Sequence, residues 1–244
     1  MTKIIAIGGW EVREKTTLQI DKEIINFSGK KNPKLLFIPT ASGDAEGYFK
    51  WIKSYFESLW CKVDVLYLIK NTPTKKEIEN KILSSDIIYV WGGNTLKMIS
   101  LWRKLGVDKI LEKALKKNIV LSWLSAGSIC WFKYGNSDSR IFTSNSTQLI
   151  KVSWLNFIHA LHCPHYDVEI HRQEDLKRMM RKSPFVAIAI ENNCAIQIEN
   201  DNYRIIPSKK WAKAYKIYWK DNQYFKEEIK QNSKYSPIEN LLRK

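Results

Sequence analysis

The stretch "VLSWLSAGSICWF", from Val120 to Phe132, contains the transition that decides the fold. An apolar run with strand character ends at Ser125, and two small residues follow before the chain becomes apolar again. This order is typical of a strand that passes into a helix through a tight turn, which exposes the serine hydroxyl at the strand end. The backbone N–H of Ala126 is then free for an oxyanion. The competing interpretation is that Ser125 is an ordinary helix N-cap.

The segments before this turn alternate between strand and helix patterns. Short continuous apolar runs predict buried strands, and apolar residues at helical spacing predict the helices between them. Thr74 and Glu77 form a capping-box pattern at one helix start. We predict strands at 3–8, 34–40, 62–68, 86–90 and 119–124, and helices at 16–27, 48–59, 74–85 and, as one or two helices, 94–118. Apolar strands that are each followed by a helix indicate a parallel sheet covered on both faces.

The pattern changes after about residue 150. Short β-prone runs ("FVAIAI", "CAIQIE", "YRIIP" and "AYKIYW") are separated by turn residues. They predict antiparallel strands that extend the sheet. We therefore expect a three-layer α/β fold, with a mostly parallel sheet, helices on both faces and an antiparallel extension near the C-terminus. Residues 1–219 are expected to form a single hydrolytic domain, and 220–244 a polar C-terminal tail or terminal helix.

Composition narrows the class of protein. The chain has 244 residues and a formal net charge of +15. Such a charge suggests a nucleic-acid partner, but the lysines are dispersed and no basic stretch carries interleaved aromatics, which favours solvated helix faces. No apolar run approaches the ~20 residues that a membrane span needs. The N-terminal "MTKIIAIGG" is interpreted as a first strand and not as a signal peptide, so the cysteines are expected to be reduced thiols in the cytoplasm: Cys61, Cys130, Cys163 and Cys194.

Small and polar residues follow the predicted strands. In open α/β sheets the chemistry lies at the carboxyl ends of the strands, so these residues should share one site. Gly8 and Gly9 follow the first strand, and "GGNT", which includes Gly92, Gly93 and Asn94, follows the strand at 86–90. Glycine backbone can approach a substrate closely, so this turn can give a second oxyanion donor. A phosphate-binding turn is the alternative, but the G-x-G-x-x-G spacing is missing.

A serine nucleophile needs a base, and all four histidines lie between residues 159 and 171. His159, His162 and His165 are spaced by three, which could suggest metal ligands, but on a strand this spacing alternates between faces, so we expect no metal site. His165, in "CPHYD" just past a strand end, is the candidate base, and His171 is the fourth histidine.

The third member of a triad should be a carboxylate that orients the imidazole. Asp138, in "YGNSDS", is the one acid between Ser125 and His165. Asp167 and Glu169 are nearby alternatives. The order serine, aspartate, histidine along the chain is acceptable because triads are defined by geometry.

At these residues the chain resembles the serine peptidases of the dipeptidase E (aspartyl dipeptidase) and cyanophycinase group, whose fold is related to class I glutamine amidotransferases. The stretches that carry the resemblance occur in order from Ile4 to Ile196: "AIGGWE", "FIPTAS", "WGGNTLKM", "LSAGSICWF", "GNSDS", "CPHYD" and "ENNCAI". The resemblance implies Ser125 as nucleophile, His165 as base, and Gly93 with Ala126 as oxyanion donors. Its carboxylate would fall at Asp138, although the loop length there varies.

We therefore predict a cytoplasmic serine hydrolase that cleaves amide bonds of small peptides without a metal or cofactor. Known relatives prefer an aspartyl residue on the acyl side, and the residues that would recognise it are not identified in this sequence. Nucleic-acid and membrane partners are not expected, and a homodimer is left open. The alternatives are an esterase or amidase with the same triad, and an inactive flavodoxin-like binding module whose serine only caps a helix.

Six tryptophans stand where turns or strand entries would suit glycine. Trp123 replaces the first glycine of G-x-S-x-G, and the chain has 10 glycines beside 10 tryptophans, whereas average usage of about 7% predicts roughly 17 glycines. Our hypothesis is that these codons are UGA in an organism that reads UGA as glycine. The alternative is that they are real tryptophans that fill a pocket or hydrophobic surface. The six are Trp10, Trp60, Trp91, Trp123, Trp154 and Trp211.

Overall fold

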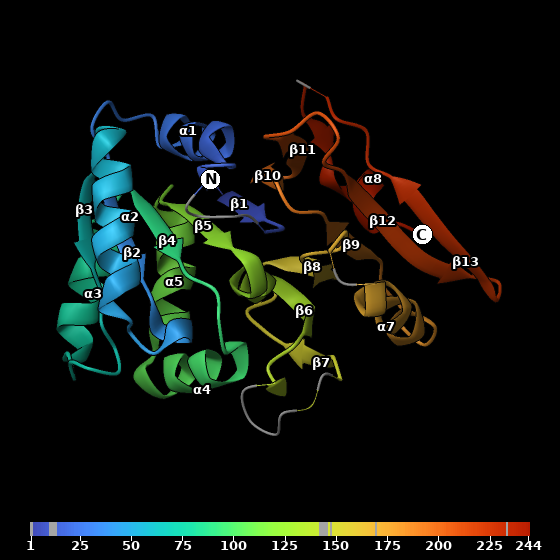
Figure 1. The fold of residues 1–244 in the computed structure, drawn as a ribbon, viewed down its shortest axis with the longest axis horizontal. Coiled ribbons are helices and arrows are strands. Elements are labelled where there is room, and N and C mark those ends of the chain that lie inside the picture. The colour runs from blue at the N-terminus through green and yellow to red at the C-terminus, as the bar shows by residue number, and fades with distance from the viewer. Residues whose placement is uncertain (1, 10–13, 142–145, 147, 169, 233) are drawn as a thin grey trace.

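The computed structural model describes residues 2–9, 14–141, 146, 148–168, 170–232 and 234–244 of the chain. They form two sheets that lie side by side (Figure 1). The larger sheet has the order β14-β11-β10-β1-β5-β4-β2-β3 among the described residues. Its parallel strands follow the sequence prediction: β1 (Lys3–Ile7), β2 (Lys34–Ile38), β3 (Lys62–Val65), β4 (Ile87–Val90) and β5 (Val120–Leu124).

Helices connect these strands and cover both faces of the sheet. Asp21 of α1 and Tyr55 of α2 share a hydrogen bond, whereas Glu79 of α3 and Lys113 of α5 form an ion pair. Right-handed crossovers place the first pair of helices on one face and the second pair on the other. Thr74 caps α3 with the predicted capping box. The helices are α1 (Leu18–Phe27), α2 (Glu46–Ser58), α3 (Lys75–Leu83), α4 (Thr95–Leu105) and α5 (Val107–Lys116), with the short 3₁₀ helix η2 (Thr40–Ser42) before α2.

The second half of the chain departs from the expected single sheet. Among the described residues, only β10 (Cys194–Glu199), β11 (Asn202–Pro207) and β14 (Ser236–Pro237) extend the first sheet. All three pair antiparallel, as predicted for β10 and β11, whereas β14 was not predicted. The other strands form a second sheet of order β13-β12-β9-β8-β6-β7. Periodicity predicts that a segment is a strand but not which partner it pairs with, so this division was not foreseen. The strands are β6 (Phe132–Ser137), β7 (Ile150–Ser153), β8 (Ile158–Cys163), β9 (Ala187–Ile190), β12 (Ala214–Lys220) and β13 (Gln223–Glu228).

The segment from residue 220 onward belongs to this second sheet over part of its length. The expected boundary after residue 219 falls inside β12, and β13 pairs with β12 along six residue pairs, from Tyr215 opposite Glu228 to Lys220 opposite Gln223. The chain then reaches a short helix, α8 (Ile238–Leu242). On the second sheet, Leu176 and Met180 of α7 (Ile170–Met180) pack against Leu161 and Ile217.

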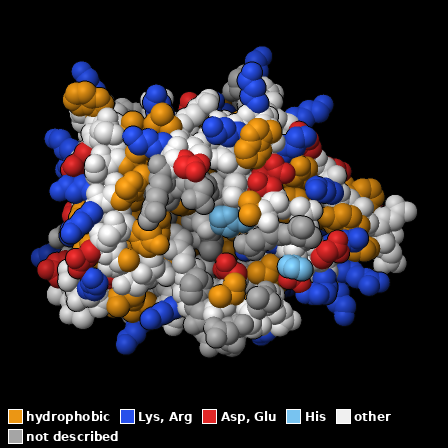
Figure 2. Space-filling view, in the orientation of Figure 1, with side chains coloured by type: hydrophobic (Ala, Val, Ile, Leu, Met, Phe, Trp, Pro, Cys, Tyr) orange, Lys and Arg blue, Asp and Glu red, His pale blue; other side chains and the backbone are white. Residues whose placement is uncertain are grey.

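One predicted helix is replaced by a different structure. After Ser125 the chain forms the 3₁₀ helix η3 (Ser125–Trp131), which passes directly into β6. A longer α-helix is therefore absent behind the turn within the described residues. No helix in the described part of the chain is both long and apolar enough to cross a membrane. Figure 2 shows lysine and arginine side chains along much of the outline of one face, with acidic side chains among them.

Candidate active site

Ser125 lies directly at the carboxyl end of β5, between β1 and β4. Its φ of 63° is in the left-handed region, which costs an L-residue roughly 1–2 kcal/mol. Gly92 lies beside it, and a Cβ there would lie 3.1 Å from Cβ and 3.3 Å from Oγ of Ser125. The strained turn and the absence of a neighbouring side chain leave the serine hydroxyl room for a substrate.

His165 lies against this hydroxyl. Its Nε2 is 2.5 Å from Oγ of Ser125, and its backbone N–H donates to the carbonyl of Gly8, at 2.9 Å. A Cβ on Gly9 would overlap the imidazole of His165. The end of β1 therefore has to be glycine, because the ring occupies the space that any side chain would take.

Asn192 lies at the other nitrogen of the imidazole. Its Oδ1 is 2.7 Å from Nδ1 of His165, and its backbone N–H donates to Oδ1 of Asp167, at 2.8 Å. An amide oxygen can only accept, so Nδ1 carries the proton and Nε2 presents its lone pair to Ser125. Asn192 was not among the predicted site residues. It lies in the turn "ENN" between two β-prone runs, and it follows strand β9 in the same way that the other site residues follow their strands.

Asp138 is held elsewhere. Its Oδ2 lies 3.6 Å from Nη2 of Arg172, a side chain that is 1% exposed. Nη1 of Arg172 also donates to the backbone carbonyl and the side-chain oxygen of Asn136, both at 3.2 Å. The position beside Nδ1 of His165, where the sequence analysis expected Asp138, is occupied by Asn192. Of the two alternatives, Asp167 contacts Asn192, and Glu169 lies outside the described residues.

The turn after β4 approaches η2 closely. Gly93 has a φ of 138°, and a Cβ there would overlap the carbonyl of Ala41. Asn94 donates its backbone N–H to this carbonyl, at 2.8 Å, and its side chain caps α4 by accepting from the amide of Lys97, at 3.0 Å. Both groups of Asn94 are therefore engaged within the protein.

The remaining histidines do not join this site. His159 is exposed on β8 and contacts Lys133, and His171 is exposed on α7. His162 is fully buried and lies 2.6 Å from Oγ of Ser128 through Nε2. Burial lowers the pKa of His162 to about 3, so its imidazole is neutral at physiological pH.

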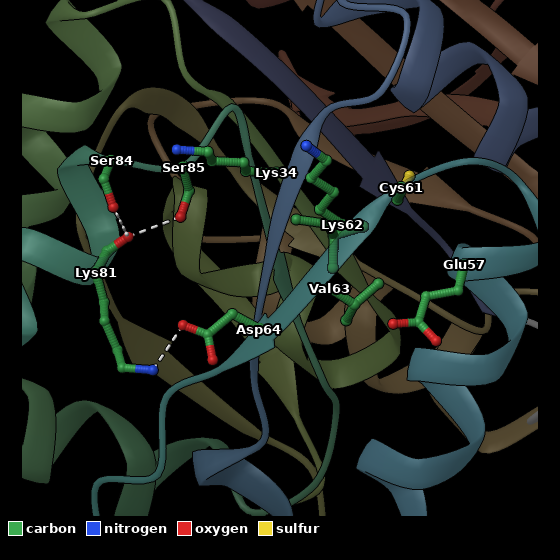
Figure 3. Close-up of a pocket in the computed structure, with 10 residues that line it drawn as sticks. Lys34, Glu57, Cys61, Lys62, Val63, Asp64, Lys81, Ser84 and Ser85 are labelled. Carbon is green, nitrogen blue, oxygen red and sulfur yellow. Dashed lines mark hydrogen bonds and ion pairs between the residues drawn. The ribbon is translucent and has the colours of Figure 1, made fainter.

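Another concavity lies at the opposite edge of the larger sheet (Figure 3). It is lined where β2 and β3 begin, by residues that include Lys34, Cys61 and Asp64, and Lys81 pairs with Asp64 at 2.6 Å. Burial raises the pKa of the Cys61 thiol to about 12, so the group is not a nucleophile. Burial also raises the pKa of Cys130, near Ser125 in the sequence, well above its usual range.

Five of the six tryptophans at glycine-like positions lie within the described residues; Trp10 lies outside them. Trp60 has a φ of 68° and is 75% exposed. It ends α2 in a Schellman motif, since its N–H bonds to Glu57 and the N–H of Cys61 bonds to Phe56, and glycine is the usual residue there. Gly29 and Gly106 take comparable left-handed positions after α1 and α4, with φ of 69° and 73°.

Trp123 lies beneath the catalytic turn. It is fully buried, its indole N–H has no hydrogen-bond partner among the described residues, and a Cβ on Gly127 would overlap its ring. The indole N–H of Trp154 is also buried and unpaired in the described part of the chain. Trp91 packs against Phe37 and Tyr48, and Trp211 is 58% exposed.

The chain belongs to peptidase family S51, whose family model matches residues 4–206. It is therefore a serine peptidase of that family. An uncharacterized peptidase of Bacillus subtilis (strain 168), YgaJ, is 34% identical over 220 residues, which cover 89% of this chain and 92% of the relative. The uncharacterized peptidase Lmo0363 of Listeria monocytogenes serovar 1/2a is 30% identical over 148 residues, 58% of this chain and 68% of that one.

Solved structures share the fold. A candidate peptidase E from Listeria monocytogenes EGD-e superposes with a TM-score of 0.64 at 24% identity, covering 85% of this chain and 98% of that chain. A peptidase from an acI-B1 Actinobacterium gives a TM-score of 0.67 at 15% identity and covers 97% of both chains. The mixed α/β architecture is thus that of these peptidases.

Proposed function

We propose that this chain hydrolyses peptide bonds of small peptides with Ser125 as nucleophile and His165 as general base. The observation that carries the proposal is the 2.5 Å separation between Oγ of Ser125 and Nε2 of His165 at a left-handed strand-end turn. Oγ attacks the carbonyl carbon while Nε2 takes its proton. The protonated imidazole then gives that proton to the leaving amine, and water releases the acyl group from Ser125 by the reverse sequence.

The developing oxyanion is assigned to the amides of Gly93 and Ala126. Gly93 is held against Ala41 and Ala126 follows the nucleophile directly, so neither donor has to move far during the reaction. Fixed donors of this kind stabilise charge that appears only in the transition state.

Asn192 is assigned the role of orienting His165. Its amide oxygen selects the tautomer with the proton on Nδ1, but it brings no negative charge to stabilise the imidazolium. Asp167 acts one step further away by holding the backbone of Asn192. Asp138 is assigned to the ion pair with the buried side chain of Arg172.

The substrate is proposed to be a small peptide in the cytoplasm, with a preference for an N-terminal or acidic residue. The formal net charge of +15 supports an acidic substrate, and the four buried free cysteines are consistent with a reducing compartment.

An esterase or amidase that uses the same residues is the second candidate, because an activated serine attacks esters as readily as amides. Turnover on a library of dipeptides with each N-terminal residue, compared with acyl esters and simple amides, tests the proposal. In the native protein, we expect hydrolysis of dipeptides that Ser125→Ala abolishes. Ester turnover without peptide turnover would favour the second candidate, and full activity in Ser125→Ala would exclude both.

A further inference from the structure

The main-chain carbonyl of Ser125 accepts a hydrogen bond from the side chain of Ser128. The hydroxyl of Ser128 donates to this carbonyl, at 2.6 Å, and Ser128 is fully buried. We propose that Ser128 is a positioning residue, which fixes the left-handed backbone of Ser125 and thereby directs its Oγ at His165. This inference rests on the proposed role of Ser125 as nucleophile.

The bond itself is common in this chain, but its setting is not. Ser28 and Ser58 also donate to the carbonyl three residues earlier, both at 2.6 Å, and both lie at helix ends where water reaches them. Such bonds often serve only to close a helix end. At Ser128 water is excluded, so a carbonyl that lost this donor would have to find another partner or move.

A second group fixes the oxygen of Ser128. Nε2 of His162 lies 2.6 Å from it, and Nδ1 of the same ring lies 3.0 Å from the carbonyl of Ile188. The ring is stacked on Phe132, with centroids 4.5 Å apart, so it cannot turn away without disturbing the core. Ser128 is thus held between a rigid imidazole and the carbonyl of Ser125.

The contacts that run from the carbonyl of Ser125 through Ser128 and His162 to the carbonyl of Ile188 share only two protons. The two carbonyl oxygens at the ends can only accept, and a neutral imidazole carries one N–H. The hydroxyl proton of Ser128 goes to the carbonyl of Ser125, so Oγ of Ser128 is left as an acceptor towards Nε2 of His162. Contacts from both sides localise this oxygen.

The hydrogen bond from Ser128 matters because the backbone of Ser125 is strained. A residue with φ of 63° keeps that conformation only where the surroundings impose it. A rotation about the N–Cα bond of Ser125, which changes this φ, moves its carbonyl and its Oγ together, so a carbonyl that shifts in this way lengthens the 2.5 Å contact between Oγ and Nε2. Ser128 would then affect the reactivity of Ser125 without touching the substrate.

The test compares Ser128→Ala, Ser128→Thr and the matched control Ser58→Ala, which removes the same bond far from the site. The rate at which a fluorophosphonate labels Ser125 is measured, together with the melting temperature and a crystal structure of each variant. We expect labelling to slow about tenfold in Ser128→Ala, as the loss of one hydrogen bond implies. Threonine, which keeps the hydroxyl, should restore the rate, and Ser58→Ala should match the parent.

The crystal structures make the result independent of catalysis. In Ser128→Ala, we expect Ser125 to leave its left-handed φ or its Oγ to move away from His165. Unchanged geometry in that variant would overturn the inference, whether or not labelling slows, because any effect would then not pass through the Ser125 backbone. Failure of the parent to label at Ser125 would instead count against the proposed function. If Ser128→Ala does not fold, Ser128→Cys, with a similar volume and a weak donor, replaces it.

Discussion

Oδ1 of Asn192 lies 2.7 Å from Nδ1 of His165, where many serine hydrolases place a carboxylate. An amide fixes the tautomer as well as a carboxylate does. It differs in the protonated state, because it offers no charge to the imidazolium. The site therefore orients its base without the electrostatic support that an ionised partner would give.

Substitutions at positions 192 and 138 should separate the two candidates for this role. We expect Asn192→Ala to lower kcat by about a hundredfold or more with little change in KM, because His165 loses its orientation. Asn192→Asp should keep or raise the activity. Asp138→Asn should have the smaller effect, measured as dipeptide turnover. A larger loss in Asp138→Asn than in Asn192→Ala would return the role to Asp138.

Substitutions of His165 and His162 should differ sharply in their effect on turnover. His165→Gln is expected to be as damaging as Ser125→Ala, because members of a triad act as a unit. His162→Gln should lose less, since His162 reaches the carbonyl of Ser125 only through Ser128. Steady-state turnover of both variants gives the comparison. If His162→Gln proved the more damaging, the base would be misassigned.

Much of the fold could be predicted because buried parallel strands have a simple signature. The strands β4 and β5 are buried along their whole length, and their mostly apolar sequences predict this burial. The second sheet was missed because β8 and β9 carry the same kind of pattern, and pairing depends on contacts between distant segments. Helix α7 was missed because its sequence is mostly polar.

The site residues that could be predicted are those that follow the carboxyl end of a strand. Gly8, Gly93, Ser125 and His165 each follow a strand, and the structure brings His165 to the other strand ends. Asn192 obeys the same rule after β9. Its amide is not the carboxylate that a triad predicts, and whether Asp138 or Asn192 reaches His165 depends on tertiary geometry.

The recoding hypothesis predicts the residues that the native protein carries. Peptide mass spectrometry should find glycine mass at positions 123 and 91, and tryptophan mass there would contradict the hypothesis. The ring of Trp123 occupies the space that a Cβ on Gly127 would take, two residues after the nucleophile. If the expressed chain carries tryptophan, we expect weak or no catalysis, and Trp123→Gly combined with Trp91→Gly should restore it.

Stability gives a separate test at position 60. Trp60 is 75% exposed and has a φ of 68°, so glycine would relieve strain and lose little packing. We expect Trp60→Gly to raise the free energy of unfolding by about 1 kcal/mol. Trp211→Gly serves as control, because Trp211 is also exposed and its φ is not positive. Equal or opposite changes in denaturant unfolding would show that the left-handed position carries no cost.

A buried carboxyl should make the stability depend on pH. Burial raises the pKa of Asp21 to about 7, while hydrogen bonds from Tyr55 and Thr17 partly oppose this. Between its ordinary value of 3.8 and about 7 the folded state holds a proton that the unfolded state has released, so this contribution to stability falls as pH rises through that range.

Asp21→Asn removes this titration. The unfolding free energy of Asp21→Asn minus that of the parent should therefore increase from about pH 4 to about pH 8. Urea denaturation at each pH measures this difference. Asp64→Asn, at an exposed carboxyl, is the matched control. A constant difference across the range in Asp21→Asn would mean that Asp21 titrates alike in both states.

The most direct test of the account is the identity of the residue that reacts. The protein is treated with a fluorophosphonate, digested, and the modified peptide is sequenced by mass spectrometry. We predict one adduct on Ser125, with labelling abolished in Ser125→Ala and greatly slowed in His165→Gln. An adduct on another residue, or peptide hydrolysis that persists while Ser125 stays unmodified, would contradict Ser125 as the nucleophile.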